Sequence, residues 1–458
     1  MSHPINSDTV IPPKATWFDR ITSTRARRLG REFVWIGLGQ AAAVLGAVVG
    51  VRILTDLLSR EVYGQLALGM TVATLVNQSV LGPLTNAATR FFAPAREAGT
   101  LRSQIAAVRS LIARSTGGIL LAVAVLCLGL FLAGQLKWIG LVLAAVLFAL
   151  LSGYNSVLSG MQNAARQRAI VALHHGLLSW GRFLLAAAMV IYLGVTSTAA
   201  MIGYALAAMF VLASQAYFFR RILLTNDKPV ALEHNAENRW RAQMFAYAWP
   251  FAIWGIPAWA QLVSDRWAIQ LFSSTEDVGL YAVLYQLGYY PITIFTSLAV
   301  QLLAPVFFRR AGDASDVSRV RHVHALNCRF TGVSLLITGM AVLLAFWLHE
   351  CVFSWLVAPA YRTVSWLLPG VVLAGGLFAS GQFAVISLLC GTQTRSLLAP
   401  KISTAVIGVL LNLFGAAHWG VPGVVCGSVL TAIVYLLWIL CLVKRQQSQL
   451  ARRAHTSR

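Results

Sequence analysis

Long apolar runs constrain this chain more than any other feature of its sequence. A helix that crosses a membrane needs about 20 mostly apolar residues, and many runs here reach that length. Of the 458 residues, 58% are apolar and only 11% are charged, whereas about a quarter of an average soluble protein is charged. We therefore expect an all-α, polytopic integral membrane protein. Twelve transmembrane helices are predicted, at residues 33–57, 62–92, 110–134, 137–160, 168–193, 197–219, 244–271, 278–308, 330–349, 364–390, 396–418 and 421–443.

Prolines inside these spans predict where the helices bend. Proline lacks the backbone N–H that would bond the carbonyl four residues earlier, so a neighbouring helix must satisfy that carbonyl. The expected kinks lie at Pro83, Pro250, Pro257, Pro291 and Pro305.

The distribution of lysine and arginine predicts how the chain is oriented. With the N-terminus in the cytoplasm, 28 of the 36 basic residues fall in cytoplasmic segments and only Arg60, Lys137 and Arg362 fall outside. This is a strong positive-inside signal and places both termini in the cytoplasm. It also accounts for the net charge of +21 without a nucleic-acid partner, through insertion and contact with anionic lipid headgroups.

The loops are too short to fold as separate domains. The longest expected outer loop is 349–363, and the largest cytoplasmic loops are 220–243 and 309–329. The six cysteines are widely separated and have no spacing typical of disulfides or zinc sites. We expect no cofactor, no metal and no enzymatic activity, since a membrane glycosyltransferase, polymerase or ligase would need a sizeable outer loop.

The two halves of the chain resemble each other. The sequence Arg52-Ile-Leu-Thr-Asp-Leu-Leu-Ser-Arg-Glu-Val-Tyr-Gly64 ends the first span, and Arg266-Trp-Ala-Ile-Gln-Leu-Phe-Ser-Ser-Thr-Glu-Asp-Val-Gly279 ends the seventh. Units of six spans enter from the same side, so the repeat is parallel, which favours a transporter with a site between the halves. The expected organisation is a basic tail (1–32), an N-terminal six-helix lobe (33–222), a cytoplasmic linker (223–243), a C-terminal six-helix lobe (244–443) and a basic tail (444–458).

Several of these motifs are similar to those of a known family. They are Arg52-x-Leu54, Leu58-Ser-x-Glu61-x-Tyr-Gly64, Gly82-Pro-Leu, Arg90-Phe-Phe and the span ends at Gly160 and Gly391. Together they resemble Wzx-like polysaccharide-biosynthesis (O-antigen) flippases of the multidrug/oligosaccharidyl-lipid/polysaccharide exporter superfamily. The resemblance implies a bacterial inner-membrane protein that moves an undecaprenyl-diphosphate-linked oligosaccharide from the inner to the outer leaflet, for O-antigen, capsule or exopolysaccharide. It also implies contacts with membrane lipids, a polysaccharide polymerase and a chain-length regulator.

Arg182 is the sharpest candidate for a substrate contact. It lies midway along the fifth span, where an arginine costs roughly 2.5–3.5 kcal/mol to insert. In a central cavity it would bind a diphosphate or an acidic sugar, because guanidinium pairs with such oxygens bidentately. The alternative is a structural arginine bonded to helix carbonyls. His175 lies seven residues earlier, on nearly the same face, and is either a substrate contact or a local hydrogen-bonding group.

Three further arginines and one acid are weaker candidates. Arg52 and Arg266 match each other in the repeat and are expected near the outer ends of their spans, where such side chains usually extend to lipid headgroups. Arg90, at the inner end of the second span, either meets the phosphate on entry or anchors the helix. Asp265 either binds a coupling ion or forms a static pair with an arginine of another helix.

Uncharged polar residues within spans can bind sugar hydroxyls or join helices. They are Gln40, Asn77, Gln78, Asn86, Asn155, Gln261, Gln286 and Gln301. Tryptophans of the seventh span, such as Trp259 and Trp267, either stack on sugars or face lipid.

Two other functions are compatible with twelve spans. A drug/cation antiporter of the same superfamily is the main alternative, but it would need embedded carboxylates, and only Asp265 qualifies. A scaffold for an assembly complex would gain nothing from a buried Arg182.

Overall fold

The computed structural model describes residues 24–225, 235–312, 317–390 and 395–456. Three predicted features lie partly or wholly outside these ranges. They are residues 1–23 of the N-terminal tail, residues 226–234 of the linker and the span end at Gly391. Every regular element in the described ranges is helical: α2 (Thr24–Leu57), α3 (Arg60–Val76), η1 (Asn77–Leu81), α4 (Gly82–Glu97), α5 (Leu101–Leu132), α6 (Leu136–Ala164), α7 (Arg168–Leu193), α8 (Ser197–Thr225), α9 (Ala236–Phe272), α10 (Thr275–Leu284), η2 (Tyr285–Tyr289), α11 (Tyr290–Ala311), α12 (Val317–Leu356), η3 (Pro359–Leu367), α13 (Leu368–Cys390), η4 (Arg395–Leu397) and α14 (Leu398–Thr456).

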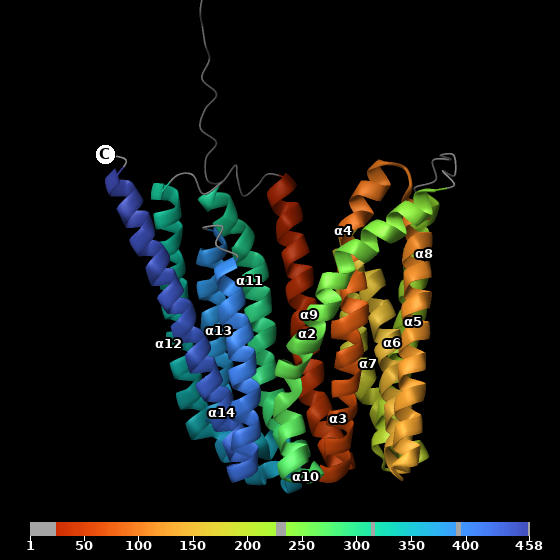
Figure 1. Cartoon of the computed structure of the whole chain (residues 1–458). Helices are drawn as coiled ribbons and strands as arrows, with labels where there is room; N and C mark the ends of the chain where they lie inside the picture. Colours follow the sequence, from red (N-terminus) through yellow and green to blue (C-terminus); the bar gives the residue numbers. More distant parts are fainter. Residues whose placement is uncertain (1–23, 226–234, 313–316, 391–394, 457–458) are drawn as a thin grey trace, which may run out of the picture.

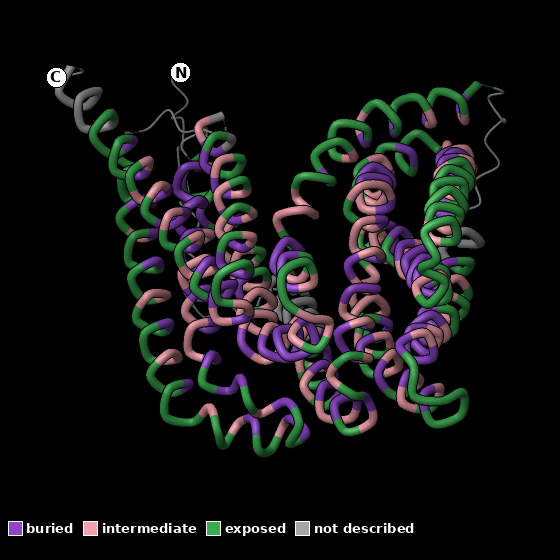
Figure 2. Tube along the Cα trace, turned by 60° about the horizontal axis from the view of Figure 1, so that its bottom comes forward, coloured by how far each residue is buried: buried purple, intermediate pink, exposed green. Residues whose placement is uncertain are grey.

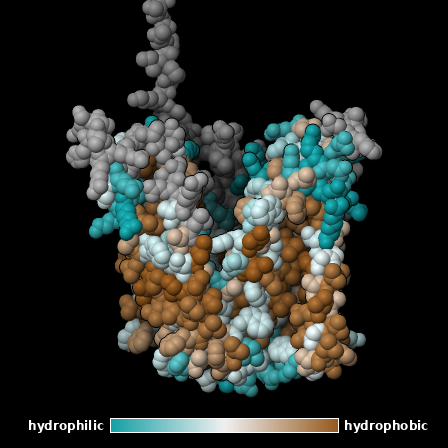
Figure 3. All heavy atoms as spheres, in the orientation of Figure 1, coloured by the Kyte–Doolittle hydropathy of each residue, from teal (hydrophilic) through white to brown (hydrophobic). Residues whose placement is uncertain are grey.

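The helices agree with the predicted spans. Ten described stretches are long and apolar enough to cross a membrane. One of them, within α14, is broken into two helices at Gly420, where φ is 57°. With α9, which is 37 residues long, this gives the twelve crossings expected from the sequence. The chain is a multi-pass membrane protein, and Figure 3 shows a broad apolar band across the face in view.

Two of the five predicted proline positions coincide with π-helical turns. η1 precedes Pro83 and η2 precedes Pro291, so each long second span of a half is interrupted near its proline. A π turn changes the local bonding register, which accommodates the carbonyl that proline leaves unpaired. The Asn77 side-chain amide also donates to the Ala73 carbonyl, at 3.0 Å.

The helices form two groups separated by a cleft at one end. In Figure 1, α11 to α14 lie on one side and α3 to α8 on the other, and the beginning of α2 and the end of α14 both lie at the upper end. Figure 3 shows the molecule hollowed between the groups at this end. In the tilted view of Figure 2, which brings the opposite end forward, buried residues gather inside each group.

The bent helix α9 contacts both groups (Figure 1). Near its start, the Trp240 indole donates to the Thr100 hydroxyl at 3.1 Å. At Gly255 its backbone lies against Gln78 and Ser79 of η1, so closely that a side chain would not fit. Farther along, Ser264 accepts a hydrogen bond from Asn412 of α14 at 2.9 Å. Helix α9 therefore packs against N-terminal helices along its length and also against α14 in its second half.

Candidate functional site

A central cavity of about 260 Å³ lies between the two halves of the chain. Residues of α3, α7, α8, α9, α10, η2 and α11 line it, and most of its polar atoms come from arginine, tyrosine, threonine and glutamine side chains. The polar lining residues are Tyr63, Thr71, Thr74, Arg182, Tyr204, Arg266, Tyr285, Gln286 and Tyr290. The structure thus brings together Arg182 and Arg266, two of the arginines that the sequence singled out.

Arg182 enters this cavity without a countercharge. Its guanidinium carbon lies 4.5 Å from the ring centroid of Phe183 and 5.9 Å from that of Tyr204. Its Nε is buried and has no hydrogen-bond partner, and no carboxylate of the described residues lies within ion-pair distance. The aromatic rings stabilise the cation through their π faces but leave its N–H groups free to bind an anion.

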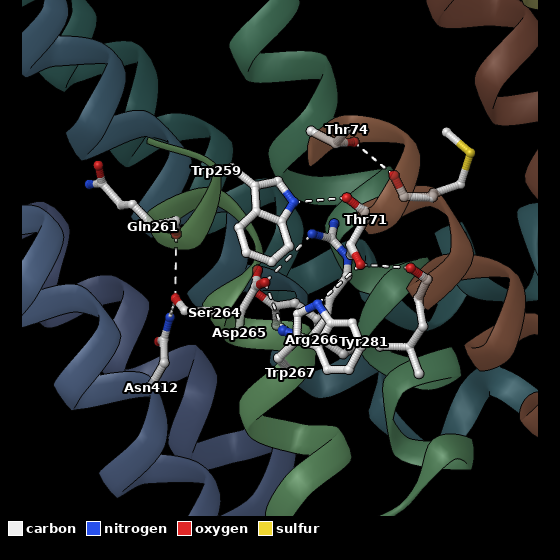
Figure 4. Close-up of polar contacts among 12 residues, drawn as sticks. Thr71, Thr74, Trp259, Gln261, Ser264, Asp265, Arg266, Trp267, Tyr281 and Asn412 are labelled. Atoms are coloured by element: carbon white, nitrogen blue, oxygen red, sulfur yellow. Dashed lines mark hydrogen bonds and ion pairs between the residues drawn. The ribbon is translucent and has the colours of Figure 1, made fainter. Parts of the chain in front are cut away.

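Arg266 is held differently, by the residue beside it in the chain. Its Nη1 lies 3.5 Å from Asp265 Oδ1, and its guanidinium carbon lies 4.4 Å from the ring centroid of Tyr285. Asp265 also accepts hydrogen bonds from the Tyr281 hydroxyl, at 2.8 Å, and from the Arg266 backbone N–H, at 2.7 Å (Figure 4). The partner of Asp265 is thus its neighbour, because the carboxylate folds back to the Arg266 N–H.

Two tryptophans of α9 attach the part of this helix around Asp265 and Arg266 to α3. The Trp259 indole donates to the Thr71 carbonyl at 2.8 Å, and the Trp267 indole donates to the Thr71 hydroxyl at 3.0 Å (Figure 4). Thr71 therefore receives two indole N–H groups from another helix. Sequence reasoning missed it, because a threonine within an apolar span carries no distinguishing signal.

A second, polar cavity of about 780 Å³ lies among α2, α4, α6, α7 and α8 and is bounded by α11 of the other half. His175 lines this cavity, together with His174, Arg168, Gln40, Asn155, Gln215 and Gln301. Its lining contains many amides and hydroxyls but no carboxylate. His175 and Arg182, predicted to share a face, line different cavities because seven residues advance a helix by about 10 Å.

Two buried amide side chains beside the polar cavity have an oxygen that accepts no hydrogen bond. Gln215 donates to Ser159 Oγ at 2.7 Å and to Gln162 Oε1 at 3.0 Å, and Asn155 donates to the Ala208 carbonyl at 2.9 Å. The oxygens Asn155 Oδ1 and Gln215 Oε1 are buried and accept no hydrogen bond within the protein. Unsatisfied buried acceptors are uncommon and require water or a ligand.

The remaining two candidate arginines lie away from both cavities. Arg52 Nε lies 3.0 Å from Asp56 Oδ2, and its Nη1 donates to the Val357 carbonyl at 2.9 Å. This contact joins α2 to the segment before η3. Arg90 is exposed on α4 and is not among the residues that line either cavity.

Several contacts between the halves close the end opposite the cleft. The Tyr361 hydroxyl donates to the Leu58 carbonyl at 2.8 Å, and the Ala358 N–H donates to the Thr55 hydroxyl at 3.2 Å. Beside them, Gly64 of α3 and Gly279 of α10 approach backbone to backbone. The three hydrogen bonds join residues 303 to 305 positions apart in the sequence, and the two glycines are 215 positions apart.

The comparisons with known proteins agree with this architecture. A family model described as polysaccharide biosynthesis protein matches residues 29–310, which is more than half of the chain. The chain belongs to this family. The resemblance predicted from the sequence is thereby confirmed, although no curated protein has a significant sequence match to the chain.

Several solved structures that share this fold are described as transporters or flippases. An inward-facing multidrug resistance MATE family transporter of the MOP superfamily is 15% identical, with a TM-score of 0.58 over 93% of this chain and 98% of its own. The lipid II flippase MurJ, in an inward closed conformation, is 11% identical, with a TM-score of 0.62 over 90% and 87%. A MOP superfamily transporter from Pyrococcus furiosus is 14% identical, with a TM-score of 0.54 over 91% and 96%. These likenesses establish the fold.

Proposed function

We propose that this protein is a flippase that moves an undecaprenyl-diphosphate-linked oligosaccharide across the bacterial inner membrane. The observation that carries the proposal is Arg182, a cation in a central cavity that has no carboxylate partner among the described residues. A buried charge without a partner is costly, so its retention in a bilayer-spanning bundle indicates an anionic cargo. Membership of the polysaccharide biosynthesis family supports the same cargo.

The anionic group of the cargo binds between Arg182 and Arg266. Both side chains line the same cavity, from α7 and α9 respectively. Asp265 orients Arg266, while the aromatic faces of Phe183 and Tyr285 hold the two guanidinium groups. Diphosphate oxygens, or the carboxylate of an acidic sugar, then accept charge-assisted hydrogen bonds from the free N–H groups.

The sugar residues occupy the polar cavity. Its volume of about 780 Å³ falls in the range of roughly 300–1,000 Å³ typical of small-ligand sites. The more accessible polar side chains of its wall, Gln40, His175 and Gln301, form hydrogen bonds with the sugar hydroxyls. The lipid tail remains in the bilayer throughout.

The open cleft faces the cytoplasm in this arrangement. The positive-inside rule supports this orientation, because the predicted cytoplasmic loops are rich in arginine and lysine. The closed end, held by Arg52, Tyr361 and the Gly64–Gly279 contact, separates when the cargo is released to the outer leaflet. A polymerase and its chain-length regulator receive the product there.

A drug/cation antiporter fits the same fold less well. Such a transporter needs a carboxylate free to bind a cation, whereas Asp265 already accepts hydrogen bonds from Tyr281 and the Arg266 N–H and pairs with the Arg266 guanidinium.

Complementation tests the proposal. In a deletion strain, a plasmid carrying the wild-type gene should restore surface polysaccharide, and Arg182→Ala should not, at equal protein levels in the membrane. Lys137→Ala, an exposed basic residue at the closed end, is the matched control and should restore it. Normal polysaccharide with Arg182→Ala would contradict the proposal.

A further inference from the structure

A third cavity, of about 770 Å³, lies outside both sites already described. It is a groove bounded by α5 on one side and by the first half of α9 on the other, with η1 and α4 at its back. Two arginines line it, Arg114 of α5 and Arg241 of α9, and no carboxylate does. The groove therefore carries an uncompensated positive charge in its lining.

Arg114 has no partner of its own among the described residues. It lies thirteen residues beyond the start of α5, which is about 20 Å along the helix axis, and its side chain is exposed. Farther along, α5 presents exposed leucines such as Leu121 and Leu128, so this helix faces lipid. An arginine at such a place requires an anion or water drawn from outside the protein.

The second arginine comes from the opposite wall. Arg241 Nη2 donates to the Asn238 side-chain oxygen at 2.7 Å, which directs the guanidinium along the start of α9. This bond is to a neutral amide and leaves the charge of Arg241 uncompensated. The groove thus receives one arginine from each of two helices.

Most of the remaining groove wall is apolar, and its α9 side chains are accessible. Phe245, Trp249 and Ile253 follow Arg241 along α9, with 60%, 50% and 63% of their surfaces exposed. A chain of methylene groups fits such a wall, while an anionic group at its polar end meets the arginines. Basic pockets between transmembrane helices are known to hold anionic lipid headgroups.

We propose that this groove binds an anionic phospholipid, with its phosphate between Arg114 and Arg241 and an acyl chain along Phe245, Trp249 and Ile253. The groove joins α5 of the N-terminal half to α9, which continues into the C-terminal half. A lipid bound there holds these two helices together in the open-cleft arrangement. This inference does not depend on the cargo of the central cavity.

Native mass spectrometry of the full-length protein, stripped of lipid in a neutral detergent, tests the inference. Titrated with phosphatidylglycerol or with phosphatidylcholine, the wild type should bind the anionic lipid more tightly. Each arginine near a membrane surface contributes about a five-fold gain, so Arg114→Gln/Arg241→Gln should bind phosphatidylglycerol about thirty-fold more weakly.

Arg109→Gln is the matched control, because Arg109 is an exposed arginine of the same helix that does not line the groove. It should retain the preference for phosphatidylglycerol. An equal loss in this control, or no preference in the wild type, would overturn the inference. Should the double variant fail to fold, Ser115→Trp fills the groove with both arginines in place. It should also lose the lipid, and tight binding by this variant would contradict the inference.

Discussion

Gly64 of α3 and Gly279 of α10, 215 positions apart in the sequence, pack backbone to backbone at the closed end of the molecule. A methyl group on Gly64 would overlap the Thr275 carbonyl oxygen, and one on Gly279 would overlap the Arg60 carbonyl oxygen. The contact is reciprocal, as expected where two copies of a repeat meet at their symmetry axis. Small residues at helix crossings in membranes allow this closeness.

Replacing Gly64 with alanine should open the closed end. The added methyl group meets backbone on a facing helix, and such overpacking costs about 1–3 kcal/mol. Spin labels on the exposed residues Ser59 and Ala360 should report a longer distance in Gly64→Ala than in the glycine-containing protein. Gly117→Ala, where nothing lies within 4 Å, should leave that distance unchanged. Equal distances in all three proteins would show that this contact does not hold the end shut.

Replacing Asp265 with asparagine should lower stability. Arg266 would lose its only ion-pair partner among the described residues, and breaking a buried pair costs about 3–5 kcal/mol. The side chains of Asp265 and Arg266 are only 9% and 14% exposed, so little solvent is available to compensate. A thermal unfolding curve measures the change, and an unaltered midpoint would contradict the structural role.

The same variant separates the structural role of Asp265 from ion coupling. If Asp265 also carries a coupling ion, transport into proteoliposomes should no longer respond to an imposed proton or sodium gradient. Wild-type transport that responds to neither gradient would remove the coupling role for Asp265, and the pairing with Arg266 would remain.

Replacing Thr71 with valine should loosen α9 from α3. The Trp267 indole would lose its acceptor, while Trp259 would keep the Thr71 carbonyl. Hydrogen bonds between membrane helices contribute about 0.6 kcal/mol on average, so a small fall in unfolding temperature and a change in tryptophan fluorescence are expected. Thr74→Val removes a hydroxyl that bonds only within its own helix, to the Met70 carbonyl, and serves as the control. An identical response of the two variants would rule out the indole contact as the cause.

Much of the fold could be predicted because it depends on local sequence. Apolar runs of sufficient length specify the spans, and Pro83 and Pro291 mark the two π turns because proline removes a backbone donor wherever it lies. The repeat predicted that Gly64 and Gly279 correspond. It did not predict that they touch, since that depends on how the two halves meet.

The site was predicted only in part, for geometric reasons. Arg266 was expected near the outer end of its span, extending to headgroups, because its position was judged by distance along the helix alone. Arg266 lines the central cavity because α9 runs between the two halves, and the face of α9 that carries Arg266 points into the cavity. Arg52, its counterpart in the repeat, bonds to Val357 at the closed end instead. Equivalent positions in a repeat therefore do not guarantee equivalent surroundings.

Binding of undecaprenyl diphosphate to the purified protein tests the central claim most directly. Charged hydrogen bonds contribute about 1.5–3 kcal/mol each, so Arg182→Ala should weaken binding at least about ten-fold. The unfolding temperature should not fall, because Arg182 has no ion-pair partner among the described residues. Undecaprenol, which lacks the phosphates, should bind wild type and variant alike. Equal affinity of wild type and Arg182→Ala for undecaprenyl diphosphate would contradict the account.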